Sequence, residues 1–564
     1  MIFKDLLVPK YFCQLLSQHC LGAVSVKCCS CAHRQQKAHV HTLKPQTCFI
    51  TTPIYYVNAA PHIGHLYCSL LADVLSRWNN FKGIQTFVST GTDEHGLKIQ
   101  QAAAAKQMDP LSFSNLVSSS FKSLFDASGI RYSRFIRTTE PDHHAAVSAF
   151  WNRLHEKGHI YKGSYSGWYS VSDEAFLTDA DVEEKTLSDG NIVKISKASG
   201  HVVTWTEEQN YLFKLTDLQA DLIHWLNTSK PIFPQRFEPA VRNMLQHLPD
   251  LSLTRDRSRL PWGIPVPGDD TQTIYVWLDA LVNYLTVTGY PNLECSQWPP
   301  TYQIIGKDIL KFHAVYWPAF LIAAGLDPPP KLVVHSHWLV DNVKMSKSLG
   351  NVVDPVDRLN KYGVDGLRYF LLKEGTLDSD CTYSDHRIVE RINTDLANTM
   401  GNLLGRLTAP SVNKKQEFVA LNQDDLYEFL SAEEREKYNE IYNLPDKVDQ
   451  LFAEFHFNKG IDLIMGHLHW ANSLVQSHTP WVLSKSDKPQ DVAQLNMILH
   501  VAMETLRVCG LLMQPVMPEL SDRLLTRLGV PGNERLFSHA KTPALSGYSN
   551  LGQKIILQKK LDSV

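Results

Sequence analysis

Two pairs of basic side chains, far apart in the chain, have the types and spacing needed to hold a polyphosphate. The stretch NAAPHIGHL places His62 and His65 three residues apart, directly after a proline. Much later, KMSKSLGN places Lys344 and Lys347 three residues apart, beside small hydroxyl residues and before a glycine. Side chains one helical turn apart share a face, and a helix start offers free N–H groups to anions. The first pair therefore predicts an anion site at a helix N-terminus, and the second a mobile loop that brings positive charge.

Metal ligation and simple burial in the core are the alternatives for the histidine pair. A zinc site needs three or four ligands, and a catalytic helix would read H-E-x-x-H. Here the pair reads His-Ile-Gly-His, without a third ligand nearby in the sequence. Five of the ten cysteines precede residue 32 and the other five are widely scattered, which favours reduced, buried thiols over a disulfide framework or a metal site. We therefore predict no metal site.

The elements around the histidines predict a doubly wound α/β fold with a parallel sheet. CFITTPIYYV (48–57) is typical of a buried parallel strand, and TFVST (86–90) predicts a second one. Between them Pro61 is placed as the first residue of a helix, and Gly64 leaves room for a flat ring close to the backbone. Ligands bind at the carboxyl edge of such sheets, which is where the histidines lie. The predicted helix has one apolar face, made by Leu66, Leu70, Leu71, Val74, Leu75 and Trp78.

The predicted secondary structure changes along the rest of the chain. Residues of about 160–260 predict short strands of an inserted module, with strands at 167–177 and 191–205. Parallel strands are predicted to return at 273–281, 302–309 and 331–340. Beyond Asp385 the chain is predicted to be largely helical, because apolar residues recur at helical spacing: Ile388, Ile392, Leu396, Leu403 and Leu407.

Composition limits the possible partners and locations. The formal net charge is −3 over 564 residues, so a nucleic-acid partner would have to bind local patches. We find no apolar run that approaches the 18 or more residues of a membrane-spanning helix, and predict no membrane association. The first 45 residues carry six Lys and Arg residues against Asp5 alone. This basic, acid-poor composition is typical of an organelle transit peptide, and a plain disordered tail is the alternative.

The two basic pairs, in this order, resemble the signature of class I aminoacyl-tRNA synthetases. The flanking segments resemble the methionyl-tRNA synthetases in particular, from about Cys48 to beyond Trp481. The synthetases for leucine, isoleucine and valine carry a large editing domain in the connecting insert, and the insert here is too short for one. The segments that carry the resemblance are TTPIYYVNAAPHIGH, TGTDEHG, WGIPVPGD, YVWLDALVNYL, IIGKDILKFH and DLANTMGNLLGR.

The resemblance implies two reactions: methionine and ATP give methionyl-adenylate, and the methionyl group then passes to tRNA(Met). Catalysis would use His62, His65, Lys344 and Lys347, with Lys347 the most important. Leu281 stands where many relatives have proline, so the rim of the methionine pocket is expected to differ. The implied ATP site is His62, Gly64, His65, Gly306, Asp308, Lys344, Met345, Ser346, Lys347 and Ser348; the implied methionine site is Ile54, Tyr56, Asp93, Trp277, Ala280, Tyr284, Ile309 and His313; and Asn402, Arg406 and Trp481 would read the anticodon.

Part of this assignment also follows from chemistry. A methionine pocket must be apolar and polarizable, because the side chain offers only a thioether, and it must hold an ammonium group. Trp277 and Tyr284 suit the first need and Asp93 the second. Without the resemblance, each aromatic residue could equally be core. Trp481 alone would more often be core, although Pro480 and Lys485 beside it favour a surface position.

The resemblance also predicts the organisation of the chain. Some members of the family carry zinc knuckles in the insert, but YSGWYSVSDEAFLTD (165–179) has no cysteine. This favours the zinc-free branch common among bacterial and organellar forms, acting as a monomer in the mitochondrial matrix with ATP and Mg²⁺. The expected parts are a transit peptide (1–45), the two halves of the catalytic domain (46–160 and 261–340), the zinc-free insert (161–260), the KMSKS loop and stem-contact region (341–387), an all-α anticodon-binding domain (388–545) and a tail (546–564).

Two other functions stay open from the sequence. A small-molecule nucleotidyltransferase could use the same histidine pair, but such enzymes usually lack the second lysine loop and the helical appendage. A non-catalytic tRNA-binding relative is the other alternative, and the intact histidines and lysines argue against it.

Overall fold

The largest sheet of the protein has six strands that all run parallel. The computed structural model describes residues 47–170, 175–177, 179–186, 191–197, 200–293, 297–345 and 350–562. The strand order reverses between β1 and β14, where Ile50 pairs with Tyr302; in such a fold ligands bind at this point, at the carboxyl ends of the strands. The predicted doubly wound fold is thus confirmed. In spatial order the strands are β3 (Arg134–Arg137), β2 (Gln85–Asp93), β1 (Thr47–Tyr56), β14 (Tyr302–Gly306), β15 (Leu332–His335) and β9 (Ile232–Phe233).

Helix α1 (Ile63–Phe81) follows β1 and starts later than predicted. His62 has extended backbone angles and caps the helix, so Pro61 precedes the helix and is not its first residue. The expected apolar face is correct, since every member is at most 2% exposed: Leu66, Leu70, Leu71, Val74, Leu75 and Trp78. The other helices of this part are α2 (Leu97–Ala105), α3 (Pro110–Ala127), α4 (Pro141–Glu156), α5 (Gln219–Ser229), α6 (Glu238–Met244), α7 (Val276–Thr286) and α8 (Trp317–Ala324).

The predicted parallel strand at 273–281 is wrong. Residues Asp269–Ile274 form β13, whose neighbours are both antiparallel, and the chain then turns into helix α7. A short apolar run rich in aromatic and β-branched residues cannot be assigned by periodicity alone. Here all of α7 except Trp277 is buried, so the helix shows no polar face in the sequence. The three-stranded sheet consists of β11 (Thr254–Asp256), β13 and β12 (Pro265–Val266).

The inserted module is built on a long antiparallel pair of strands, in agreement with the short strands predicted for this part of the chain. Strands β4 and β8 pair along their length, with Trp168 opposite Trp205. Farther along, β9 returns to the edge of the parallel sheet beside β15, so the segment 161–260 contributes to both structures. The module's strands are β4 (Ile160–Ser170), β5 (Ala175–Leu177), β8 (Thr204–Phe213), β10 (Leu251–Ser252), β6 (Val182–Thr186) and β7 (Ile192–Ser196).

A tight hairpin carries Lys344 back toward the sheet. Strand β16 (Trp338–Val340) pairs with β17 (Val343–Lys344) and with β18 (Cys381–Thr382). The turn residues Asp341 and Asn342 both have positive φ, at 50° and 61°, as two-residue hairpin turns require. The predicted strand 331–340 is therefore split between β15 and β16.

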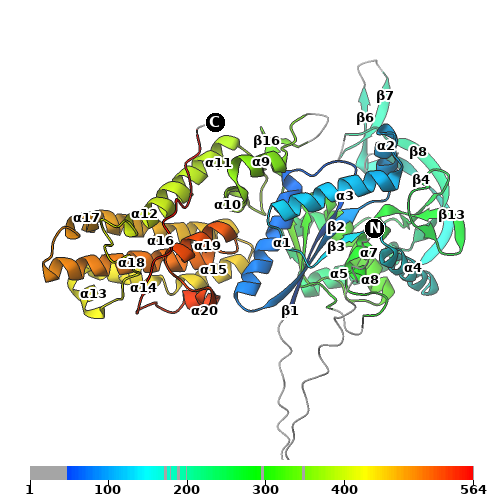
Figure 1. The fold of residues 1–564 in the computed structure, drawn as a ribbon. Helices are drawn as coiled ribbons and strands as arrows, with labels where there is room; N and C mark the ends of the chain where they lie inside the picture. Colours follow the sequence, from blue (N-terminus) through cyan, green and yellow to red (C-terminus); the bar gives the residue numbers. More distant parts are fainter. Residues whose placement is uncertain are drawn as a thin grey trace, which may run out of the picture. The chain divides into compact units, whose positions relative to one another are not determined.

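The chain beyond Asp385 is largely helical, as predicted, and two more helices, α9 and α10, precede it from Pro355. Helices α15, α16, α18 and α19 pack side by side (Figure 1). Ile388, Ile392, Leu396, Leu403 and Leu407 are fully buried, but residues Ile392–Gly401 form a π-helix rather than a regular α-helix. The helices are α9 (Pro355–Tyr362), α10 (Val364–Glu374), α11 (Asp385–Arg391), α12 (Asn402–Leu407), α13 (Gln423–Phe429), α14 (Ala432–Glu440), α15 (Leu444–Ala453), α16 (Phe457–His478), α17 (Pro480–Leu483), α18 (Pro489–Met513), α19 (Pro518–Arg527) and α20 (Phe537–Ala540).

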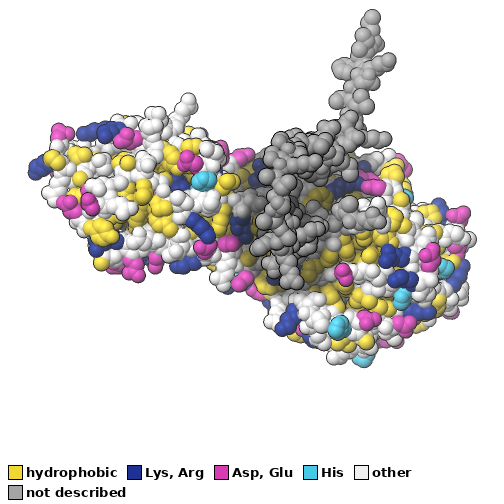
Figure 2. Space-filling model, turned by 90° about the horizontal axis from the view of Figure 1, so that it is seen from below, with side chains coloured by type: hydrophobic (Ala, Val, Ile, Leu, Met, Phe, Trp, Pro, Cys, Tyr) yellow, Lys and Arg dark blue, Asp and Glu magenta, His cyan; other side chains and the backbone are white. Residues whose placement is uncertain are grey.

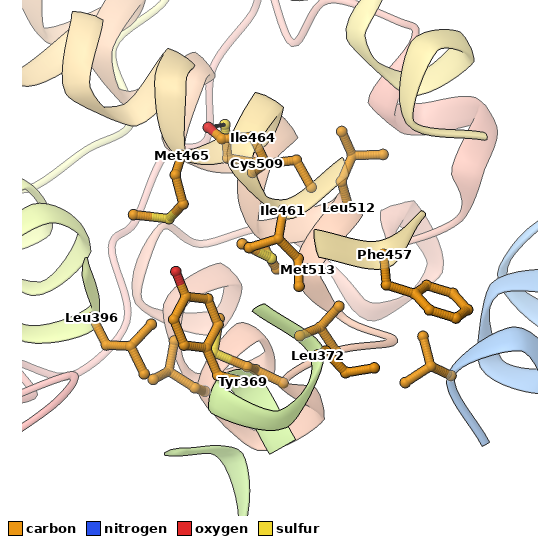
Figure 3. Packing of buried hydrophobic residues seen from close by; sticks show 14 of the residues in the cluster. Tyr369, Leu372, Leu396, Phe457, Ile461, Ile464, Met465, Cys509, Leu512 and Met513 are labelled. Atoms are coloured by element: carbon orange, nitrogen blue, oxygen red, sulfur yellow. Dashed lines mark hydrogen bonds between the residues drawn. The ribbon is translucent and has the colours of Figure 1, made fainter. Parts of the chain in front are cut away.

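A buried apolar cluster joins α10 to the helical part. Figure 3 shows Tyr369 and Leu372 of α10 packed toward Ile461 of α16 and Met513 of α18. The hydroxyl of Tyr369 donates to Asp395 at 2.7 Å. Among the described residues, α18 is the helix long and apolar enough to cross a membrane, but 89% of that window is buried inside the protein. It is a core helix by this measure.

On the face shown in Figure 2, Lys and Arg side chains alternate with Asp and Glu. The described cysteines, Cys48, Cys68, Cys381 and Cys509, are all free and buried. In the described ranges no group of three or more His, Cys, Asp or Glu side chains could hold a metal ion.

Candidate active site

One cavity of about 390 Å³ opens at the carboxyl ends of the central strands and gathers residues from both halves of the fold. Its walls come from β1, α1, the end of β2, α7, the segment after β14 and the β15–β17 region. Of the residues predicted for ATP and methionine, those lining this cavity are Ile54, Tyr56, His62, Gly64, His65, Asp93, Trp277, Ala280, Tyr284, Gly306, Asp308, Ile309, His313, Lys344 and Met345. Ser346, Lys347 and Ser348 lie outside the described residues.

The two histidines of α1 cap the helix and lie face to face. Their ring centroids are 3.8 Å apart with 28° between the planes. The Gly64 N–H donates to Nδ1 of His62 at 3.0 Å, and the His62 N–H donates to Nδ1 of His65 at 3.1 Å. A backbone N–H can only donate, so each Nδ1 is an acceptor and the ring proton lies on Nε2. Each ring therefore carries its proton on Nε2 as a hydrogen-bond donor, and both residues line the cavity.

Gly64 makes this arrangement possible. A Cβ at this position would lie 2.9 Å from Cε1 of His62, closer than carbon atoms can approach. The flat ring that occupies the space left by the absent side chain is thus the imidazole of His62. The predicted free N–H groups are partly used by the capping rings, so an anion would meet imidazole donors at this helix start.

Opposite α1, a second group of charges surrounds Asp308. Its carboxylate lies 3.9 Å from Nζ of Lys344 and 3.5 Å from Nε2 of His337. Withdrawal from bulk water raises the pKa of Asp308, but His337 and Lys344 outweigh this effect and hold it well below its usual range. A Cβ on Gly306 would lie 2.6 Å from Oδ1 of Asp308. Lys344 is 61% exposed, so its ammonium group is accessible to a ligand.

The other end of the cavity is neutral and apolar. Nδ1 of His313 donates to the carbonyl of Ile309 at 2.9 Å, so Nε2 accepts from the hydroxyl of Tyr284 at 2.8 Å. Burial lowers the pKa of His313 to about 4, which keeps the imidazole uncharged at neutral pH. Trp277 stacks on Phe312 with centroids 3.4 Å apart. Such a wall suits a thioether better than a charged or strongly polar side chain.

Asp93 stands where this apolar end meets the sheet. It is the last residue of β2, is 8% exposed, and is in register with Tyr56 at the end of β1. The ammonium group of Lys98 lies 5.9 Å from the centroid of the Tyr56 ring. A single carboxylate at the edge of an apolar pocket is suited to an α-ammonium group.

Comparison with known proteins identifies the family. Residues 48–408 match the family of tRNA synthetases class I (M). The chain is 47% identical over 486 residues to the mitochondrial methionine–tRNA ligase of Xenopus laevis, covering 86% of each chain. It is 49% identical over 502 residues to the Homo sapiens protein of the same name, covering 86% of this chain and 84% of that one. The chain belongs to the methionyl-tRNA synthetases.

The similarity to a solved methionyl-tRNA synthetase extends over nearly the whole chain. The Mycobacterium tuberculosis methionyl-tRNA synthetase in complex with methionyl-adenylate superposes with a TM-score of 0.86 and 37% identity, covering 91% of this chain and 99% of that one. The predicted resemblance to class I methionyl-tRNA synthetases is therefore confirmed.

Several residues line the cavity without having been predicted for this member of the methionyl-tRNA synthetases. His335 ends β15, Ser336 and His337 follow it, and Lys98 lies in the first turn of α2. The rule that ligands bind at the carboxyl ends of parallel strands did not point to the first three residues, because the predicted strand ran on to residue 340 whereas β15 ends at His335. Nothing in the sequence around Lys98 marks it out. Cys68 and Asn283 also line the cavity.

The three residues expected to read the anticodon lie on the helical part. Asn402 and Arg406 are exposed, one turn apart on α12. Trp481, on α17, is partly buried and packs against the apolar core. The ring of Trp481 is thus partly exposed to solvent and partly packed on the core.

Proposed function

We propose that this chain is a mitochondrial enzyme that joins methionine to tRNA(Met) through a methionyl-adenylate intermediate. One observation carries the proposal: a single cavity is lined both by a neutral apolar group of residues bounded by Asp93 and by the basic side chains of His62, His65 and Lys344. These two groups suit methionine and a triphosphate, respectively. The names of the relatives support the mitochondrial location, and the predicted transit peptide (1–45) agrees with it, although it lies outside the described residues.

Methionine binding uses the apolar end. The thioether packs against Trp277, Ala280, Tyr284, Ile309 and His313, and the ammonium group pairs with Asp93. The hydroxyl proton of Tyr284 is already donated to His313, so this hydroxyl is not available as a donor to a polar side chain. Discrimination then rests on shape and on the cost of burying an unpaired polar group.

Adenylate formation needs positioning and charge stabilisation. The methionine carboxylate is already ionised at neutral pH and attacks the α-phosphorus of ATP directly, with pyrophosphate leaving. Nε2 of His62 and of His65 donates to phosphate oxygens, and Lys344 and Lys347 neutralise charge on the departing pyrophosphate. Gly306 and Asp308 hold the adenosine together with Met345 and its neighbours Ser346 and Ser348.

Mg²⁺ is expected to accompany the triphosphate. No group of three or more potential ligands occurs among the described side chains, so the ion would be held mainly by phosphate oxygens and water. We further propose that the enzyme acts as a monomer, without structural zinc, and that its parts divide at the boundaries predicted from the sequence.

The anticodon is read by the helical part. Asn402 and Arg406 offer hydrogen bonds to base edges, and Trp481 offers a stacking face. Trp481→Ala should abolish charging of tRNA(Met) while sparing ATP–pyrophosphate exchange. Thermal unfolding is measured in parallel, because the ring also packs on the core. Charging at the wild-type rate by a folded variant would remove Trp481 from this role.

The decisive assay for the proposed function is methionine-dependent ATP–pyrophosphate exchange followed by charging of tRNA(Met). We expect exchange with methionine and not with leucine or isoleucine, and transfer to tRNA. Exchange with no amino acid but with a small phosphorylated substrate would favour the nucleotidyltransferase alternative. Absence of both reactions, with tRNA still bound, would favour the non-catalytic alternative.

A further inference from the structure

A buried carboxylate behind the cavity joins three elements through two imidazoles. Asp279 lies on α7 and is fully buried. Its Oδ2 is 2.6 Å from Nδ1 of His95, just after β2, and its Oδ1 is 2.7 Å from Nε2 of His143 on α4. His143 is also fully buried, and His95 is 3% exposed. None of the three lines the cavity.

The two faces of α7 have different tasks. Trp277, Ala280 and Tyr284 point to the cavity. Asp279 and Thr286, two turns apart on the helix, are both held by His143, whose Nδ1 lies 3.0 Å from the Thr286 hydroxyl. The hydrogen bonds of His143 to Asp279 and Thr286 therefore hold α7, and with it the side chains that line the cavity.

The hydrogen-bond pattern makes Asp279 an acceptor on both sides. The Thr286 hydroxyl donates to the carbonyl of Val282, so it accepts from Nδ1 of His143, and the Nε2 of that ring also faces a carboxylate. The ring of His143 is thus held between the hydroxyl of Thr286 and the carboxylate of Asp279. Burial raises the pKa of Asp279, but the charge of His95 and the hydrogen bonds of both imidazoles outweigh it and keep the pKa below its usual range.

The second imidazole connects this pair to the end of β2. His95 comes two residues after Asp93, and its ring packs edge-on against Trp262 with centroids 5.5 Å apart. Trp262 in turn donates from Nε1 to the carbonyl of Glu94 at 2.6 Å. A shift of Asp279 would therefore displace His95 and, with it, the segment 93–95 that begins with Asp93.

We propose that Asp279 is a positioning residue for methionine recognition. By holding His95 and His143 together, it fixes the helix that carries the apolar wall to the strand end that carries Asp93. This inference rests on the proposed function, because it assumes that methionine spans these two groups. Burying a carboxylate costs desolvation energy even when it is paired, so the Asp279 cluster adds little stability by itself, and its benefit here is the fixed spacing between the ammonium site and the thioether site.

The test compares Michaelis constants in ATP–pyrophosphate exchange. Asp279→Asn replaces one acceptor with a donor, so one imidazole loses its partner. We expect the KM for methionine to rise about 10-fold or more, because a misplaced half-site weakens positioning, while the KM for ATP stays within about 2-fold. Glu504→Gln is the matched control: it breaks the buried pair with Arg507 in the helical part and should lower stability without changing the KM for methionine.

Rescue at His95 keeps the test informative if Asp279→Asn does not fold. The amide nitrogen of Asn can take the place of Nδ1, so His95→Asn should keep a KM for methionine near that of the wild type, whereas His95→Ala should raise it about 10-fold. Equal KM values for His95→Ala and wild type, equal losses for both His95 variants, or equal rises for methionine and ATP would overturn the proposal. Wild-type protein without methionine-dependent exchange would instead overturn the proposed function.

Discussion

The two ends of the cavity are built in opposite ways. At the methionine end, the side chains are buried and joined to one another, as in the Tyr284–His313–Ile309 chain. At the phosphate end, His62 and His65 lie at a helix tip and Lys344 is 61% exposed beside Asp308. The side chains of the first end are neutral and joined by hydrogen bonds, whereas the second end is charged and includes Lys344, three residues before Lys347 in the sequence.

This difference matches the two tasks of the proposed reaction. Selecting one amino acid requires a pocket whose shape exists before the substrate arrives, because each misplaced group reduces discrimination. Stabilising a triphosphate and its departing pyrophosphate requires charge that can approach the substrate and withdraw. Substitutions at the two ends should therefore have different effects. At the methionine end they should raise the KM for methionine, and at the phosphate end they should lower the rate of adenylate formation.

The largest effect is expected at Lys347. Lys347→Ala removes the charge predicted to neutralise pyrophosphate, so kcat for exchange should fall about 10³-fold, with little change in methionine binding. Stopped-flow adenylate formation and equilibrium methionine binding are the measurements. The control is Lys414→Ala, which removes an exposed lysine just after α12. Equal losses of rate and methionine affinity would contradict the division between the ends.

A pair of substitutions at His65 separates capping from catalysis. His65→Asn keeps an acceptor where Nδ1 caps His62 but loses the Nε2 donor, so kcat should fall about 10²-fold with little change in stability. His65→Gln keeps a donor near Nε2 and loses the cap, so stability should fall by about 1 kcal/mol with a smaller loss of rate. The two variants are compared by exchange kinetics and by urea unfolding. The reverse pattern would show that the helix cap, and not the donor, sets the rate.

The neutral end predicts a pH dependence of stability. Because burial lowers the pKa of His313 to about 4 from 6.5, the unfolded chain binds a proton at this residue before the folded protein does. The contribution of the neutral His313 to the free energy of unfolding is fully present above pH 6.5 and is lost as the pH falls toward 4. By pH 5 the free energy of unfolding is lower by about 2 kcal/mol. Urea unfolding of wild type and His313→Gln at pH 7 and pH 5 measures this difference. A wild-type protein that loses no more stability than the variant would mean that the imidazole is charged in the pocket.

The smallest effect should come from the hydroxyl of Tyr284. Tyr284→Phe leaves Nε2 of His313 buried without its donor, which should loosen the wall and raise the KM for methionine about 10-fold, with ATP unaffected. Tyr369→Phe is the control, since it removes another buried hydroxyl, bonded to Asp395 in the helical core. If both variants left the KM for methionine unchanged, the Tyr284–His313 contact would not shape the pocket.

Much of the site could be predicted from the sequence because it follows strand ends. Motifs that directly follow a strand, such as those containing His62 and Asp93, are placed at one edge by the topology of a parallel sheet. The prediction of a strand at 273–281 was wrong because both faces of α7 are buried, so the sequence of this helix shows no alternation of apolar and polar residues at helical spacing. The capping by His62 and His65 depends on side-chain geometry within one turn. The Asp279–His143 contact joins residues 136 positions apart, and no local pattern announces it.

The most direct test of the account is a crystal structure of the protein with a non-hydrolysable methionyl-adenylate analogue. We expect the thioether between Trp277 and the Tyr284–His313 pair, the ammonium group on Asp93, and a phosphate oxygen within hydrogen-bond distance of Nε2 of His62 or His65. An analogue bound with its ends reversed, or outside this cavity, would contradict the central claim that one cavity holds methionine and the triphosphate at chemically opposite ends.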